Sequence, residues 1–186
     1  MKQKFNNIKS TAFLIIIMLS GLSSVGQQIY QTKEGSIGVI GTYNDARVIA
    51  NSNHLFALIN YETAEIELSL NPVVLRTTAD SLNLKLLNSS IGLAVLKGKL
   101  NIPYVNTLNH PDHKLNFEAE LHLNGIVKSM YVTGELKHIA SSGAISCLLT
   151  LNFKLGLSDF EIVLPEGWNN EITIQIAQAV LKRSNQ

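Results

Sequence analysis

The stretch from Leu115 to Val132 constrains the fold of this chain more than any other part of it. Two runs of alternating apolar and polar residues are separated there by Asn124-Gly125. Alternation with a period of two places one set of side chains on each face of a strand. Asn-Gly between two such runs favours a type I′ turn, because both central residues of that turn need a positive φ. The stretch is therefore predicted to be an antiparallel hairpin with one buried and one solvated face.

The turn also fixes the register of this hairpin, because it pairs Leu123 with Ile126. A slip by one residue would turn every side chain to the opposite face. On the apolar face of the hairpin, Lys128 is then the one charged residue. The predicted apolar pairs are Phe117 with Val132, Ala119 with Met130, and Leu121 with Lys128, and the polar pairs are Glu118 with Tyr131 and Glu120 with Ser129.

Other segments alternate in the same way and predict further strands. The clearest are Ala64 to Leu70, Ile145 to Leu155 and Ile172 to Ile176, together with a second hairpin around Asn44-Asp45. Breaks are expected at Lys33-Glu34-Gly35 and Asn51-Ser52-Asn53, and a bulge or strand end at Gly134. Only one short helix is expected, capped by Thr78. About eight strands with short turns and almost no helix indicate a single all-β domain, either a sandwich or a barrel.

The N-terminus has the order of parts that is typical of a secretory signal peptide. Lys2, Lys4 and Lys9 precede an unbroken apolar run from Ala12 to Leu19, and Ser24-Val25-Gly26 supplies small residues for cleavage. A run of eight is short of the roughly 20 apolar residues that span a membrane. We therefore expect residues 1–26 to be a signal peptide, residues 27–186 to be the domain, and the mature protein to be periplasmic or secreted, with no transmembrane segment.

Composition narrows the possible partners of the mature chain. Loss of the three lysines moves the formal net charge from +1 to −2, and charged residues make up 16% of the chain. Nucleic-acid binding needs a basic face and is not expected. Cys147 is the only cysteine, so no internal disulfide is expected, and its strand position predicts an inert, inward-facing thiol.

The sequence contains no recognisable catalytic motif. No nucleophile elbow, glycine-rich phosphate loop or Cys-x-x-Cys pair occurs in the mature chain. We therefore predict no enzyme activity, no catalytic residues, no cofactor and no metal ion. One alternative is open: if the hairpin register continues past Gly134, His110, His113 and His138 would gather with Asp112 as possible zinc ligands.

Several segments together resemble the YceI-like family of exported proteins. The hairpin segment Leu121 to Lys128, the strand Leu149 to Phe153, the segment Ser158-Asp159-Phe160-Glu161-Ile162 and the final strand Glu171 to Leu181 are similar to that family's pattern. The resemblance covers roughly residues 114–182. It implies an extended lipocalin-like antiparallel β-barrel whose interior can hold a long apolar chain, such as a polyisoprenoid.

Inward-facing residues of the strong strands are the candidate ligand contacts. Lys128 either extends its ammonium out of the barrel mouth or contacts the polar head of a ligand. Two functions follow: a carrier for an amphipathic lipid or isoprenoid, or a structural or interaction module of the cell envelope with a packed interior. The candidate lining residues are Phe117, Leu121, Lys128, Met130, Val132, Leu149, Leu151 and Phe153.

We predict cleavage of the exported protein after Gly26, because the basic, apolar and small-residue regions follow one another in the order that signal peptidases require. N-terminal sequencing of the exported protein should begin at Gln27. Recovery of mature protein that still carries Met1 to Gly26 would contradict this assignment.

Overall fold

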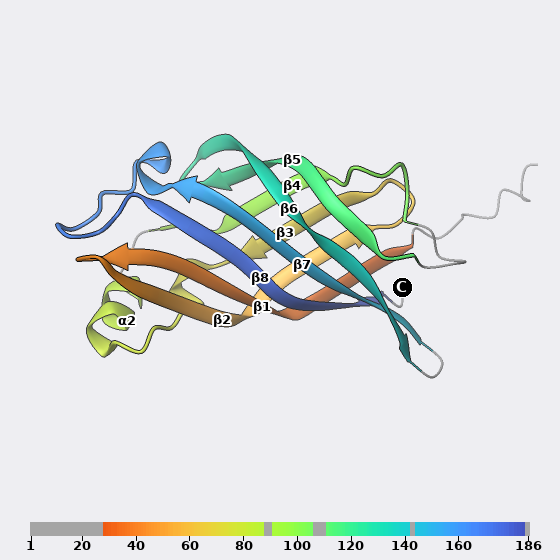
Figure 1. The fold of residues 1–186 in the computed structure, drawn as a ribbon, viewed down its shortest axis with the longest axis horizontal. Helices are drawn as coiled ribbons and strands as arrows, with labels where there is room; N and C mark the ends of the chain where they lie inside the picture. The colour runs from red at the N-terminus through yellow and green to blue at the C-terminus, as the bar shows by residue number, and fades with distance from the viewer. Residues whose placement is uncertain (1–27, 88–90, 106–110, 142–143, 185–186) are drawn as a thin grey trace, which may run out of the picture.

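The computed structural model describes residues 28–87, 91–105, 111–141 and 144–184, which form one closed antiparallel barrel of eight strands (Figure 1). Each strand pairs with the next along the chain, and β1 pairs with β8. The all-β barrel prediction is confirmed. The strands are β1 (Ile29–Tyr43), β2 (Ala46–Asn60), β3 (Glu65–Leu70), β4 (Ala94–Lys99), β5 (His113–Leu123), β6 (Ile126–Ser141), β7 (Ala144–Gly156) and β8 (Glu171–Arg183).

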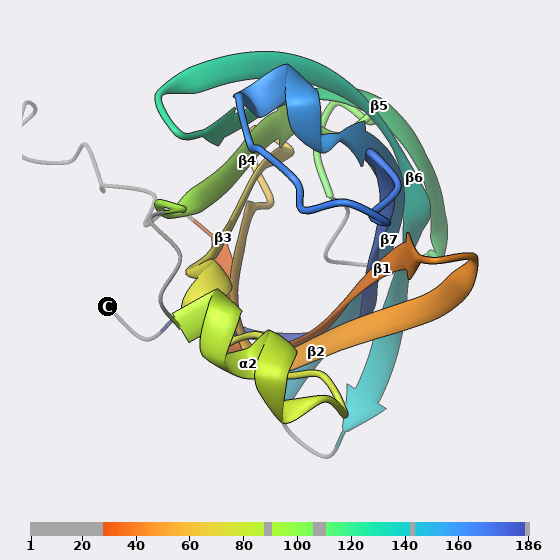
Figure 2. The same ribbon diagram turned by 90° about the vertical axis from the view of Figure 1, so that its left-hand side faces the viewer.

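Short helices lie at one end of this barrel. They are η1 (Pro72–Val74), α2 (Asp80–Leu87) and η2 (Leu157–Phe160). The same end carries the β1–β2 and β5–β6 turns, and we call it the open end (Figure 2). The first residue of β1 and the last of β8 lie at the opposite end, which we call the closed end (Figure 1). Within the described residues, no helix is long and apolar enough to cross a membrane.

The predicted central hairpin is confirmed pair by pair. Phe117 pairs with Val132, Ala119 with Met130, Leu121 with Lys128, Glu118 with Tyr131 and Glu120 with Ser129. Asn124 and Gly125 have φ values of 52° and 76°, as the type I′ turn requires. The second predicted hairpin is also confirmed, since Asn44 and Asp45 have φ values of 46° and 62°.

Two predicted breaks are wrong, because the chain passes through them as continuous strand. β1 runs through Lys33-Glu34-Gly35, and β2 runs through Asn51-Ser52-Asn53. The polar residues mark shifts in the β1–β2 register around Gly35 instead of turns. A bulge of this kind bends a strand without ending it, so it helps long strands to curve around a barrel.

The bulge expected at Gly134 is also wrong. β6 pairs with both neighbours through this position, with Leu115 opposite Gly134 on one side and Leu151 opposite it on the other. An added Cβ would lie 2.8 Å from Leu151 Cδ2 and would also meet the Thr150 carbonyl oxygen. Glycine is needed here because β7 approaches the backbone closely, not because the strand bends.

The helix after β3 begins two residues beyond the expected cap. Thr77, not Thr78, makes the local bonds, since its Oγ1 accepts a hydrogen bond from the Ala79 amide at 3.1 Å. The Thr77 amide in turn donates to Asn83 Oδ1 at 2.7 Å. These bonds anchor the start of α2 to the segment that follows η1.

We predict that Gly134→Ala destabilises the barrel by about 1–3 kcal/mol, because the new methyl group forces β6 and β7 apart. Denaturant unfolding of the variant and the wild type measures the difference. Gly92→Ala is the control, since a Cβ at Gly92 meets no atom within 4 Å. Equal stability of Gly134→Ala and wild type would contradict the close approach.

Candidate functional site

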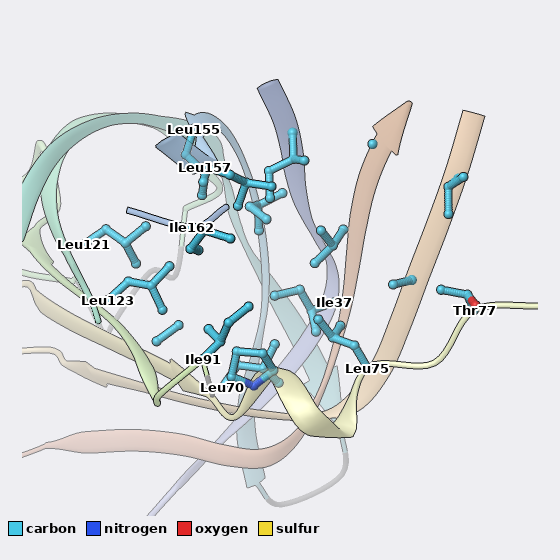
Figure 3. A pocket seen from close by; sticks show the side chains of 18 of the residues that line it. Ile37, Leu70, Leu75, Thr77, Ile91, Leu121, Leu123, Leu155, Leu157 and Ile162 are labelled. Carbon is cyan, nitrogen blue, oxygen red and sulfur yellow. The ribbon is translucent and has the colours of Figure 1, made fainter. Parts of the chain in front are cut away.

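An apolar pocket of about 390 Å³ lies inside the open end of the barrel (Figure 3). Ligand-binding pockets commonly measure about 300–1,000 Å³, so this one is large enough for a small ligand. Figure 3 shows Leu121 and Leu123 entering it from one side, Leu155 and Leu157 from another, and Ile37 from a third. The pocket is therefore enclosed by several strands, as expected for an eight-stranded barrel that holds one ligand.

The strands contribute inward-facing residues from their open-end portions only. These positions carry medium-sized aliphatic side chains for the most part, which leave space along the axis. The strand residues that line the pocket are Ile37, Val39 and Gly41 of β1, Val48, Ala50 and Leu55 of β2, Leu68, Ser69 and Leu70 of β3, Ala94 and Leu96 of β4, Leu121 and Leu123 of β5, Phe153 and Leu155 of β7, and Ile172, Ile174 and Ile176 of β8.

The η2 segment takes the place of β6 in the pocket wall. β6 pairs with β7 only from Thr133 onward, so the first half of β6 diverges from its neighbour. No residue of β6 lines the pocket, whereas Leu157 and Ile162 do. The Asn124 side chain donates to the Phe160 carbonyl oxygen at 3.4 Å, which ties η2 to the β5–β6 hairpin. Phe160 is fully buried and anchors the segment.

The segment between β3 and β4 closes the opposite side of the mouth. Asn51 and Arg76 exchange two backbone hydrogen bonds of 2.8 Å each, which join this segment to β2. Leu75 is consequently buried and points into the pocket, as Figure 3 shows. Leu82 and Lys85 of α2 complete this side.

Polar side chains are scarce in the pocket. Among the described residues that line it, only Ser69, Thr77, Lys85 and Trp168, through its indole N–H, have a polar side-chain group. The Thr77 hydroxyl is engaged locally with the Ala79 carbonyl and Asn83. Lys85 is exposed and stands at the mouth on α2. An apolar interior with a single cation at the rim suits a ligand whose apolar part enters and whose polar end faces water.

The closed end of the barrel is packed. Tyr30 and Tyr61 stack with ring centroids 3.9 Å apart. The Tyr61 hydroxyl is hydrogen-bonded to Cys147 Sγ, which also lies 3.5 Å from His138 Nδ1. Burial raises the pKa of the Tyr61 hydroxyl far above its usual range, and the neighbouring Cys147 raises it further. Burial likewise raises the pKa of the Cys147 thiol, although its bond with Tyr61 lowers that pKa in part.

The possible zinc ligands named from the sequence, His110, His113, His138 and Asp112, do not form a complete metal site among the described residues. The register does continue past Gly134, with His113 opposite Leu136, and the His138 amide donates to Asp112 Oδ1 at 3.3 Å. His110 lies outside the described residues. Among the residues that the structure describes, no group of three histidine, cysteine or acidic side chains is placed to hold a metal ion.

The eight residues predicted to line the interior divide between the two ends. Leu121 and Phe153 line the pocket. Lys128 is exposed and Met130 half-buried on the diverging part of β6, and neither lines the pocket. Phe117, Val132, Leu149 and Leu151 are buried on the closed-end side, outside the pocket. The cation at the pocket mouth is thus Lys85 and not Lys128.

Sequence reasoning missed the residues supplied by the connections. Leu75, Leu157 and Ile162 line the pocket, although none of them belongs to a strand. The signal for the last of these was the apolar run Ile162-Val163-Leu164 before Pro165. Apolar residues in a solvent-facing connection are unusual and suggest a covered or ligand-facing position.

Comparison with known proteins shows similarity in fold alone. No family model matches the sequence, and no curated protein matches it. A polyisoprenoid binding domain from Saccharophagus degradans, implicated in plant cell wall breakdown, is similar with a TM-score of 0.64 and 10% identity, over 86% of this chain and 99% of that one. BcnA of Burkholderia cenocepacia is similar with a TM-score of 0.55 and 10% identity, over 81% of this chain and 96% of that one.

We predict that Cys147 reacts very slowly with thiol reagents in the native protein. Its side chain is 1% exposed, and its raised pKa leaves little thiolate at neutral pH. Labelling followed by mass spectrometry should show modification only after denaturant is added. Rapid labelling of the native protein, or a dimer linked through Cys147, would contradict the packed closed end.

Proposed function

We propose that this protein is an exported binding or carrier protein of the YceI-like type, which holds the apolar part of an amphipathic lipid in its open-end pocket. The observation that carries the proposal is the apolar pocket of about 390 Å³ in the open end of the barrel. Burial of apolar ligand surface there is favourable at about 25 cal/mol per Å². No buried charge in the described lining has to be desolvated, because Lys85 is exposed at the rim.

The shared fold supports an apolar ligand of this kind. One of the similar solved structures is a polyisoprenoid binding domain, and its fold covers most of the present chain. The proposal extends to binding without chemical conversion, since the described lining is mostly aliphatic and only Ser69, Thr77, Lys85 and Trp168 carry a polar side-chain group. Export to the periplasm or the exterior is part of the same proposal and rests on residues 1–26, which lie outside the described residues.

A second candidate is a structural or interaction module of the cell envelope that carries no small ligand. The packed closed end favours it, because that half of the barrel has a solid core around Tyr30 and Tyr61. This candidate gives no reason for the space at the open end. A barrel without a ligand gains stability from a filled interior, and an empty apolar volume forfeits those contacts.

A pair of tryptophan substitutions distinguishes the two candidates. Leu123→Trp adds volume inside the pocket and should abolish lipid binding at little cost in stability. Leu151→Trp adds the same volume to the packed half and should destabilise the protein by about 1–3 kcal/mol. Denaturant unfolding measures the stabilities of both variants.

Native mass spectrometry of the purified wild type, followed by organic extraction, measures the bound lipid. The proposal expects a lipid on the wild type and none on Leu123→Trp. Absence of any lipid from the wild type, together with a large loss of stability in Leu123→Trp, would favour the ligand-free module and refute the carrier.

A further inference from the structure

We infer that the pocket limits the length of the chain that it accepts, and that it encloses about ten carbon atoms of a single apolar chain. This inference rests on the proposed lipid-binding function and specifies the ligand. The juxtaposition that carries it is a hollow open end directly above a packed closed end within one barrel. Leu55, Leu68, Leu96 and Ile176 form the boundary, which we call the floor.

The depth of the pocket gives an estimate of chain length. On β8 the lining extends from Ile172 to Ile176, and the next inward residues, Ala179 and Leu181, are buried outside it. Four residue steps of about 3.3 Å give a depth of about 13 Å along the strand. A saturated chain advances about 1.25 Å per carbon, given bonds of about 1.5 Å at tetrahedral angles. The depth therefore accommodates about ten carbons.

The volume of the pocket fits a single chain of this length. A methylene group occupies about the volume of a water molecule in the liquid, which is about 30 Å³, so ten of them need about 300 Å³. The pocket measures about 390 Å³ and is open at its mouth. Two chains side by side at the same depth would need about 600 Å³.

The floor is closed because buried side chains fill the interior below it. Ile66, Ala119 and Leu151 are 2%, 3% and 3% exposed. Each is the next inward residue after a lining residue of its own strand, Leu68 on β3, Leu121 on β5 and Phe153 on β7, and none of the three lines the pocket. The open space therefore ends at this level on three different strands.

The closed end holds this floor in place. Beneath it lie the stacked rings of Tyr30 and Tyr61, together with Leu149 and Leu181, both fully buried. Displacing them would break the bond between the Tyr61 hydroxyl and Cys147 and leave buried polar groups unpaired, which is costly. A longer chain therefore gains no further burial within the barrel. Its remainder extends past the mouth, where Val163, in the connection that follows η2, is 92% exposed.

A homologous series of saturated fatty acids with six to eighteen carbons tests this limit. The acids are added to delipidated mature protein, each below its aggregation concentration, and compete with a pocket-bound fluorescent naphthalene sulfonate. Each buried methylene should strengthen binding about fourfold, the factor expected from burial of one methylene group. The rise should stop at about ten carbons, because further methylenes remain in water.

Leu55→Ala tests whether the floor sets the limit. This change removes three carbon atoms from the floor, so the plateau should move to chains about three carbons longer. Leu149→Ala is the matched control, because it removes the same atoms from the packed half and should leave the plateau where it is. Leu96→Ala serves as a second floor variant if Leu55→Ala does not fold, and the same shift is expected.

The outcomes separate this inference from the proposed function. Binding that strengthens steadily through eighteen carbons, or a plateau that neither floor variant moves, would overturn the length limit while leaving the lipid carrier intact. A complete lack of binding at every length would overturn the carrier itself. A plateau that moves with the floor variants and not with Leu149→Ala supports both.

Discussion

Pairing of β1 with β8 is the constraint on which the rest of the structure depends. These strands come from the two ends of the described chain and pair from Tyr30 opposite Arg183 to Ile40 opposite Thr173. This pairing converts an open sheet into a barrel and removes its exposed edges. Closure also gives all inward-facing side chains one shared interior. Whether that interior is filled or hollow then depends on the size of the side chains at each level.

The packing of side chains divides the interior into two halves. At the closed end Tyr30, Tyr61 and Phe117 are all buried, and the two tyrosine rings stack. The open end also has aromatic lining residues, Phe153 and Trp168, but Gly41, Ala50 and Ala94 leave space beside the other side chains there. The two functions considered for this barrel, a lipid carrier and a packed module, therefore correspond to its two halves. The packed half supplies the core, and the hollow half supplies the binding site.

Local patterns in the sequence were sufficient to predict the all-β class and the central hairpin but not the site, and the choice of a barrel over a sandwich came from the family resemblance. The central hairpin and its register depend on alternation and on Asn124-Gly125, which are local features. Alternation reports which face a residue occupies and says nothing of its level along the barrel axis. Phe117 and Leu121 share a face, yet only Leu121 lines the pocket. That level depends on how the strands are staggered and on where η2 inserts, and both arise from contacts between distant segments.

Direct observation of which methyl groups touch a bound chain tests the division of the barrel most sharply. Nuclear Overhauser effects can be measured between decanoate and the methyl groups of isotopically labelled mature protein. We predict contacts with Leu68, Leu96, Leu123 and Ile174, which line the pocket, and none with Val132, Leu149 or Leu181. Contacts with methyl groups of the closed end, or contacts confined to the outer surface, would contradict a barrel that is hollow at one end and packed at the other.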